Sequence, residues 1–117
     1  MTEFDPKITG IVKLLRRGRE KHSHSLEQIE GKDHPRPIVL EPGETIIGRA
    51  PDCAIRLSSS RASRHHAALR LFGTECQLCD KESDNGVFLN GIKIHSAVLR
   101  DGDVIQLADT AFIYYED

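Results

Sequence analysis

Residues 48–90 decide the fold of this chain. The stretch opens with Gly48-Arg49, passes through Arg61-Ala62-Ser63-Arg64-His65-His66, and closes with Ser83-Asp84-Asn85-Gly86-Val87-Phe88-Leu89-Asn90. Between these polar clusters, residues 54–57 and 67–71 alternate apolar and polar side chains or are mostly apolar. Such short runs are typical of half-buried strands, so the polar clusters fall in loops at the strand ends. Because loops on a rigid sheet often carry binding groups, we expect them to present arginine, serine and asparagine side chains to a ligand.

Short strand patterns separated by turn signals continue along the rest of the chain. Strands are predicted at residues 25–30, 37–40, 45–47, 55–57, 67–71, 75–79, 87–89, 92–94, 104–107 and 111–115. Asn90-Gly91 is the strongest short hairpin signal, and Asp101-Gly102 predicts another turn. Many short strands with frequent turns favour an all-β sandwich or barrel, and the pattern alone leaves both open.

The polar clusters, taken in order, match a known family. Gly48-Arg49, Ser63-Arg64-x-His66 and Ser83-x-Asn85-Gly86 resemble the motifs of the forkhead-associated (FHA) domain, a β-sandwich that recognises phosphothreonine peptides. The resemblance extends to a closing segment, residues 99–105, and covers residues 23–117. It implies an FHA-like β-sandwich of two antiparallel or mixed sheets for this part. It also sets residues 1–22 apart as an N-terminal extension.

The resemblance implies roles for four side chains. In the family, the residues that match Arg49 and Ser63 contact the phosphate, and the residue that matches Arg64 lies beside it. The family asparagine, here Asn85, holds the backbone of the bound peptide. Chemistry agrees with these roles, because an arginine fork can bind two phosphate oxygens and an asparagine amide both donates and accepts.

Further residues of the same clusters complete the implied site. Arg61 falls where family members often read the residue three places after the phosphothreonine, so an acidic residue is expected there. Ser83 and Asp84 belong to the implied peptide-binding loop. Three other residues are expected to support the loops structurally rather than touch the ligand: Gly48, His66 and Gly86.

Two positions depart from the family pattern. Val87 stands where the family usually has threonine, and keeps its branched shape without the hydroxyl. Asp84 stands where the family tends to have serine, threonine or a basic residue, and adds a carboxylate beside Glu82 and Asp80. If the Asp84 carboxylate faces the phosphate it weakens binding by charge repulsion, and if it points to solvent it has little effect.

Residues 1–22 show a different pattern. Ile8, Ile11, Val12 and Leu15 recur at helical spacing among several lysines and arginines, which predicts a short amphipathic helix. Such a helix either covers part of the sandwich or links to a neighbour, or it binds an acidic partner or membrane surface.

One cysteine pair has the spacing of a metal or redox site. Cys76 and Cys79 resemble half of a zinc site, and His22 and His24 are further candidate ligands. On a strand, however, residues three apart point to opposite faces, so we expect the thiols to diverge. We therefore predict no metal and no cofactor.

A second cluster contains the residue types of a hydrolase triad, namely Ser63, His65, His66 and Asp80. A Gly-x-Ser-x-Gly nucleophile motif is absent from the sequence, and a triad is defined by geometry. We expect a binding module rather than an enzyme.

Composition limits the class of protein. The chain of 117 residues is long enough for one domain, and its formal charge of −2 argues against nucleic acid as a partner. The sequence has neither an apolar run of membrane-spanning length nor the apolar segment of a secretory signal at its start. Three cysteines, an odd number, do not suggest a disulfide framework. A soluble, intracellular and cytoplasmic protein with reduced thiols is expected.

The predicted function is phosphothreonine-dependent interaction with a phosphorylated partner protein or peptide in signalling. The alternative is an interaction module that does not read phosphate and uses another sandwich face or the N-terminal helix. The two functions differ in whether phosphatase treatment of the partner abolishes binding.

Overall fold

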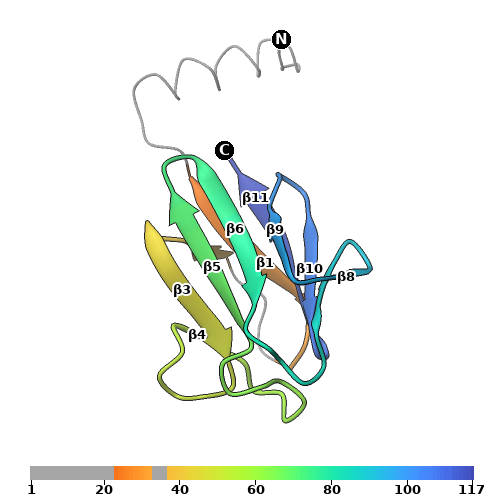
Figure 1. Ribbon diagram of the computed structural model, residues 1–117. Helices are drawn as coiled ribbons and strands as arrows, with labels where there is room; N and C mark the ends of the chain where they lie inside the picture. Colours follow the sequence, from red (N-terminus) through yellow and green to blue (C-terminus); the bar gives the residue numbers. More distant parts are fainter. Residues whose placement is uncertain (1–22, 33–36) are drawn as a thin grey trace.

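The computed structural model describes residues 23–32 and 37–117, and in this part eleven β-strands form two sheets packed face to face (Figure 1). The six-stranded sheet has the order β2 (Pro37–Val39), β1 (His24–Glu30), β11 (Thr110–Glu116), β10 (Val104–Leu107), β7 (Val87–Leu89) and β8 (Ile92–Ile94). The five-stranded sheet has the order β4 (Ile55–Arg56), β3 (Gly43–Gly48), β5 (Ala67–Phe72), β6 (Glu75–Asp80) and β9 (Ser96–Val98). The predicted all-β sandwich is confirmed.

Two predictions concern the N-terminal end of the chain. The helix predicted within residues 1–22 lies outside the described residues, and the division at residue 23 stays a prediction. Within the described part, no helix is long and apolar enough to cross a membrane.

The core lies between the two sheets, and the alternation of side chains explains it. Leu69 and Leu71 of β5 and Leu78 of β6 face inward, and meet Phe112 and Tyr114 of β11 from the opposite sheet. All five side chains are buried. Burial of large apolar side chains is the main source of stability in a domain with few aromatic residues and no tryptophan.

Most predicted strands are present, with small shifts at their ends. The Asn90-Gly91 hairpin between β7 and β8 is confirmed, and both residues have the positive φ angles, 51° and 85°, that a tight hairpin turn of this kind needs. The strand β9 was missing from the sequence prediction. Its three residues lie at a sheet edge and pair with β6, so they carry too little alternation for a pattern to reveal them.

The cysteine pair on β6 diverges, as its spacing predicts. Cys76 is buried in the core, while Cys79 lies half-buried on the outer face, where Arg70 Nη1 is 3.6 Å from its sulfur. His24, the candidate ligand on β1, is buried and hydrogen-bonded through Nδ1 to the Tyr114 hydroxyl at 2.6 Å. The Cys76–Cys79 pair therefore cannot close on one metal ion.

Burial of Cys76 makes stability depend on alkaline pH. Burial raises the pKa of its thiol from 9.0 to about 11, because the thiolate loses solvation, and burial also raises the pKa of Tyr114. Because the pKa is higher in the folded state than in the unfolded state, the protonated thiol contributes to the free energy of unfolding. This contribution is complete below pH 9.0 and is lost as the pH rises toward about 11.

We therefore expect the free energy of unfolding of the wild type to fall between pH 9.0 and about 11 by more than that of Cys76→Ala. Urea unfolding at several alkaline pH values measures this difference, and Cys79→Ala is the control on the same strand. Parallel curves for the wild type and Cys76→Ala would contradict the assignment of the effect to this thiol.

Candidate functional site

Three polar loops meet at one end of the sandwich (Figure 1). They are the β3–β4 loop (49–54), the β4–β5 loop (57–66) and the β6–β7 loop (81–86). The register explains the meeting, because Ile47 pairs with Ala67, and Ala67 pairs with Asp80. One row of the five-stranded sheet therefore holds the end of β3, the start of β5 and the end of β6.

The first two loops touch at Gly48. A Cβ atom at this position would lie 2.2 Å from the carbonyl oxygen of Arg64 and 3.0 Å from the Cα atom of His65, and both are backbone atoms that cannot swing aside. Main-chain hydrogen bonds from Arg49 N to Ser63 O and from Ala50 N to Arg64 O, each 3.0 Å, join the loops on either side. Only glycine allows this contact.

His66 connects the β4–β5 loop to the β6–β7 loop. Its side chain is fully buried, its Nδ1 accepts a 3.0 Å hydrogen bond from the Ser63 amide, and its Nε2 donates a 2.8 Å bond to the Gly86 carbonyl. A main-chain amide only donates and a carbonyl only accepts, so these partners assign the proton to Nε2. The histidine is a structural link between loops.

Three side chains next to these loop contacts can donate hydrogen bonds to a ligand: Arg49, Ser63 and Arg64. Arg49 is half-buried, and its Nε donates a 3.0 Å hydrogen bond to the carbonyl of Ala62, which fixes the plane of the guanidinium group. The Ser63 hydroxyl oxygen accepts a 3.0 Å bond from the Asp84 amide, so its own hydrogen can still be donated. Arg64 is exposed beside Ser63. In the described residues, no carboxylate forms an ion pair with Arg49 or Arg64.

The β6–β7 loop is shaped by its own side chains. The Asp80 carboxylate accepts from the Ser83 amide and the Ser83 hydroxyl accepts from the Gly86 amide, both at 3.0 Å. Asn85 donates a 2.7 Å hydrogen bond from its side-chain amide to the Arg61 carbonyl, which ties this loop to the β4–β5 loop. Asp84 is exposed and contacts Ser63 through its main chain. Ser83 and Gly86 thus shape the loop, while Asn85 and Asp84 lie at its surface.

The two departures from the family pattern differ in their surroundings. Val87 is fully buried in the apolar core, where a methyl group needs no hydrogen-bond partner. Asp84 is exposed, and its main-chain amide donates a 3.0 Å hydrogen bond to the Ser63 hydroxyl.

Sequence reasoning missed the anchor of the β4–β5 loop. Ser59 is buried and its hydroxyl accepts a 3.0 Å hydrogen bond from the Arg61 amide. The same hydroxyl bonds to Asp109 in the β10–β11 turn and lowers the pKa of that carboxyl, and the charge of Arg61 adds to the effect. Ser59 looks like one of three loop serines in the sequence, and no local pattern links it to a residue fifty positions later.

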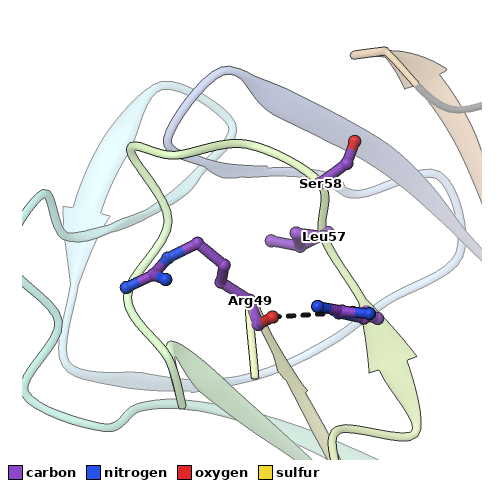
Figure 2. A pocket seen from close by; sticks show the side chains of 4 residues that line it. Arg49, Leu57 and Ser58 are labelled. Carbon is purple, nitrogen blue, oxygen red and sulfur yellow. Dashed lines mark hydrogen bonds between the residues drawn. The ribbon is translucent and has the colours of Figure 1, made fainter. Parts of the chain in front are cut away.

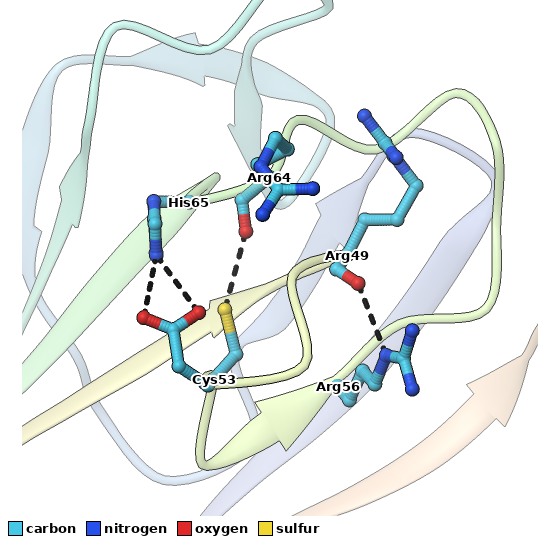
Figure 3. Close-up of polar contacts among 6 residues, drawn as sticks. Arg49, Cys53, Arg56, Arg64 and His65 are labelled. Carbon is cyan, nitrogen blue, oxygen red and sulfur yellow. Dashed lines mark hydrogen bonds and ion pairs between the residues drawn. The ribbon is translucent and has the colours of Figure 1, made fainter.

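A second missed cluster lies under Arg64 (Figure 3). Both carboxylate oxygens of Asp52 are 3.1 Å from His65 Nε2, and the Cys53 thiol donates to the Arg64 carbonyl at 3.2 Å. The hydrogen bond from His65 lowers the pKa of Asp52, and burial raises the pKa of Cys53 and keeps it a thiol. These contacts hold the main chain of residues 64 and 65 in place.

The same cluster is the set of described residues that could together hold a metal ion. The ligand atoms of Asp52, Cys53 and His65 lie within 4.8 Å of one another. Protonation of the thiol and the nearby charge of Arg64 both oppose a cation there. We interpret the cluster as support for the loop.

The hydrolase alternative does not fit the observed contacts. His66 Nδ1 accepts from the Ser63 amide rather than from its hydroxyl, and the Asp80 oxygen accepts from the Ser83 amide. A catalytic triad needs the histidine on the hydroxyl and the carboxylate on the histidine. These residues build loops instead.

Comparison with known proteins identifies the family. The family model of the FHA domain matches residues 45–108, which include all three loops. The chain belongs to the FHA domain family. The family resemblance inferred from the sequence is thereby confirmed.

Similar proteins and structures extend the match. The chain is 34% identical over 113 residues to the ABC transporter ATP-binding/permease protein Rv1747 of Mycobacterium tuberculosis, covering 97% of the chain and 11% of that protein. It is 38% identical over 77 residues to the glycogen accumulation regulator GarA of Mycolicibacterium smegmatis, covering 66% of the chain and 49% of GarA. The chain therefore spans between about a tenth and about half of these relatives.

A solved structure from a structural and functional analysis of phosphothreonine-dependent FHA domain interactions superposes with a TM-score of 0.75 at 33% identity. The match covers 80% of this chain and 95% of that one. Nearly all of that solved structure therefore matches the fold of this chain.

The His66 link makes a prediction about stability. His66→Ala should lower the free energy of unfolding by about 3 kcal/mol or more, because the Ser63 amide and the Gly86 carbonyl lose their partner and a cavity forms. His65→Ala, a change of the same type at the exposed neighbouring position, should cost far less. Urea unfolding measures both, and equal losses would contradict the role of His66.

Proposed function

We propose that this domain binds a phosphothreonine-containing segment of a partner protein, and that binding rather than catalysis is its activity. The observation that carries the proposal is the pairing of Arg49 and Ser63 through the Gly48 contact. A fixed guanidinium group and a fixed hydroxyl are held by adjoining loops, and each retains donors that no described residue uses.

The donors suit a phosphate dianion. The terminal nitrogens of Arg49 provide a planar fork for two oxygens, and the Ser63 hydroxyl provides a short-range donor. Arg64 adds a second positive charge at the rim. Because the donors are held before the ligand arrives, binding loses little free energy to ordering the loops.

We expect Asn85 and Arg61 to contact the rest of the peptide. One amide hydrogen of Asn85 is engaged by the Arg61 carbonyl, which leaves its oxygen and its other hydrogen for a peptide backbone. Arg61 is exposed and lies close enough to Asp109 to lower the pKa of that carboxyl. An acidic peptide residue at the third place after the phosphothreonine would therefore share Arg61 with Asp109.

The comparisons support this function by analogy. The structural relative described above comes from work on phosphothreonine-dependent FHA interactions, and this chain overlays nearly all of it. The proposed partner is a phosphorylated protein or peptide, whose identity depends on residues around the phosphothreonine.

The first functional prediction concerns Arg49. Arg49→Ala should weaken binding of a phosphothreonine peptide on the order of a hundred-fold, since it removes a bidentate charged contact. Arg49→Lys should restore only part of the loss, because an ammonium group keeps the charge without the fork.

Isothermal titration with a degenerate phosphothreonine peptide library and its dephosphorylated form is the measurement. Arg100→Ala, an exposed arginine after β9, is the matched control and should bind as the wild type does. Equal affinity of the wild type and Arg49→Ala would refute the site. Binding that survives dephosphorylation would favour an interaction module that does not read phosphate.

The second functional prediction concerns Asp84. Asp84→Ser removes a carboxylate beside Ser63 and keeps the main-chain amide that donates to the serine hydroxyl. We expect binding to tighten several-fold, on the order of 1 kcal/mol at low salt, with a smaller gain at high salt because salt screens exposed charges.

The control is Glu82→Gln, which removes a charge from the same exposed loop without altering a contact to Ser63. Peptide titrations at two salt concentrations compare both variants with the wild type. An absence of any gain for Asp84→Ser at low salt would show that its carboxylate does not oppose the phosphate.

A further inference from the structure

A further basic side chain, that of Arg56, lies beside the proposed phosphate site and has no role in it so far. Arg49, Arg56, Leu57 and Ser58 line a surface depression of about 430 Å³, between the end of β3 and the β4–β5 loop (Figure 2). None of the four residues is acidic. The depression therefore presents positive charge without an internal counter-ion.

The backbone fixes Arg56 in this position. Residue 56 pairs with Gly48 across the parallel β3–β4 contact, and the Leu57 amide donates a 2.7 Å hydrogen bond to the Gly48 carbonyl. Arg56 Nε donates a 3.1 Å hydrogen bond to the carbonyl oxygen of Arg49. One edge of the guanidinium group is thus held, and its terminal nitrogens have no carboxylate partner among the described residues.

The two arginines do not converge on one point. In Figure 3 the Arg49 side chain extends away from Arg56, whose guanidinium group lies at the Arg49 carbonyl. An anion held at the tip of Arg49 next to Ser63 therefore leaves Arg56 available for a different anion. The geometry separates two subsites that share the backbone of Arg49.

Local charge favours a second anion. Residues 49–66 contain four arginines and one acidic residue, Asp52, although the whole chain has a formal charge of −2. Asp52 is paired with His65 rather than with an arginine. A ligand with two negative groups would gain from this field at both subsites.

We propose that Arg56, with the depression that it lines, is a second anion subsite of the peptide-binding surface. It takes an acidic group of the same phosphopeptide, either a carboxylate side chain or a second phosphate. This inference rests on the proposed phosphothreonine binding. Both subsites adjoin Arg49, and an extended peptide advances roughly 3.3 Å per residue, so we expect the second group to lie a few residues from the phosphothreonine.

The test is a double-mutant cycle between Arg56 and the peptide, using the full chain. A phosphothreonine peptide is varied at one position at a time on both sides of the phosphothreonine. Each position carries glutamate, glutamine, phosphoserine or serine in turn. Fluorescence anisotropy gives the dissociation constants for the wild type, Arg56→Gln and the control Arg100→Gln.

At one or two positions, glutamate should bind roughly three- to ten-fold more tightly than glutamine to the wild type and to Arg100→Gln. In Arg56→Gln the affinity ratio of glutamate over glutamine should fall to about one at those positions. This holds even if the substitution changes the overall affinity for all the peptides. A preference read by Arg61 should persist in Arg56→Gln. If the affinity ratio of phosphoserine over serine exceeds that of glutamate over glutamine, the subsite binds a second phosphate. If the two ratios are equal, it binds any acidic group.

Two failures are distinguishable. If the wild type binds the singly phosphorylated peptides but no acid preference depends on Arg56, the second subsite is overturned and the proposed function stands. If none of the phosphothreonine peptides binds better than its dephosphorylated form, the proposed function fails and the subsite fails with it.

Discussion

The close approach of two backbones at Gly48 is the constraint on which the binding surface depends. A side chain there would place a carbon atom 2.2 Å from the Arg64 carbonyl oxygen, so the two loops could not touch. Because they do touch, main-chain hydrogen bonds join Arg49 to Ser63 and Ala50 to Arg64, each at 3.0 Å. The two side chains proposed to bind phosphate are thus placed by backbone contacts, which are stiffer than side-chain contacts, and the site is formed before a ligand arrives.

The third loop is tied to the second by a buried histidine and an exposed asparagine. His66 bonds both to Ser63 and to Gly86, and Asn85 bonds to the Arg61 carbonyl. The Ser59 hydroxyl adds an anchor to Asp109 on the other sheet. Each link satisfies a polar group that would otherwise cost free energy on burial or lie loose at the surface. Ligand binding and domain stability therefore share residues, and loss of a link affects both.

The sequence predicted local features well and distant contacts poorly. Alternation along β5 and β6 and the Asn90-Gly91 turn are properties of neighbouring residues, so the strands and the hairpin could be inferred. The Gly48 and His66 positions were inferred from the order of the motifs, because a family pattern records distant contacts indirectly. The anchors Ser59–Asp109 and Asp52–His65 involve common polar residues far apart in the chain, and the edge strand β9 is too short to show a period.

The geometry of the donors separates what the two subsites can recognise. Arg49 belongs to one loop and Ser63 and Arg64 to another, and several donors together suit a tetrahedral group with several oxygens more than a planar carboxylate. Arg56 is a single planar fork held along one edge, which suits a carboxylate and a phosphate about equally. We therefore expect the proposed main subsite to select for phosphorylation and the proposed second subsite to recognise any acidic group. Such a division lets the state of one threonine control binding and lets its neighbours set the choice of partner.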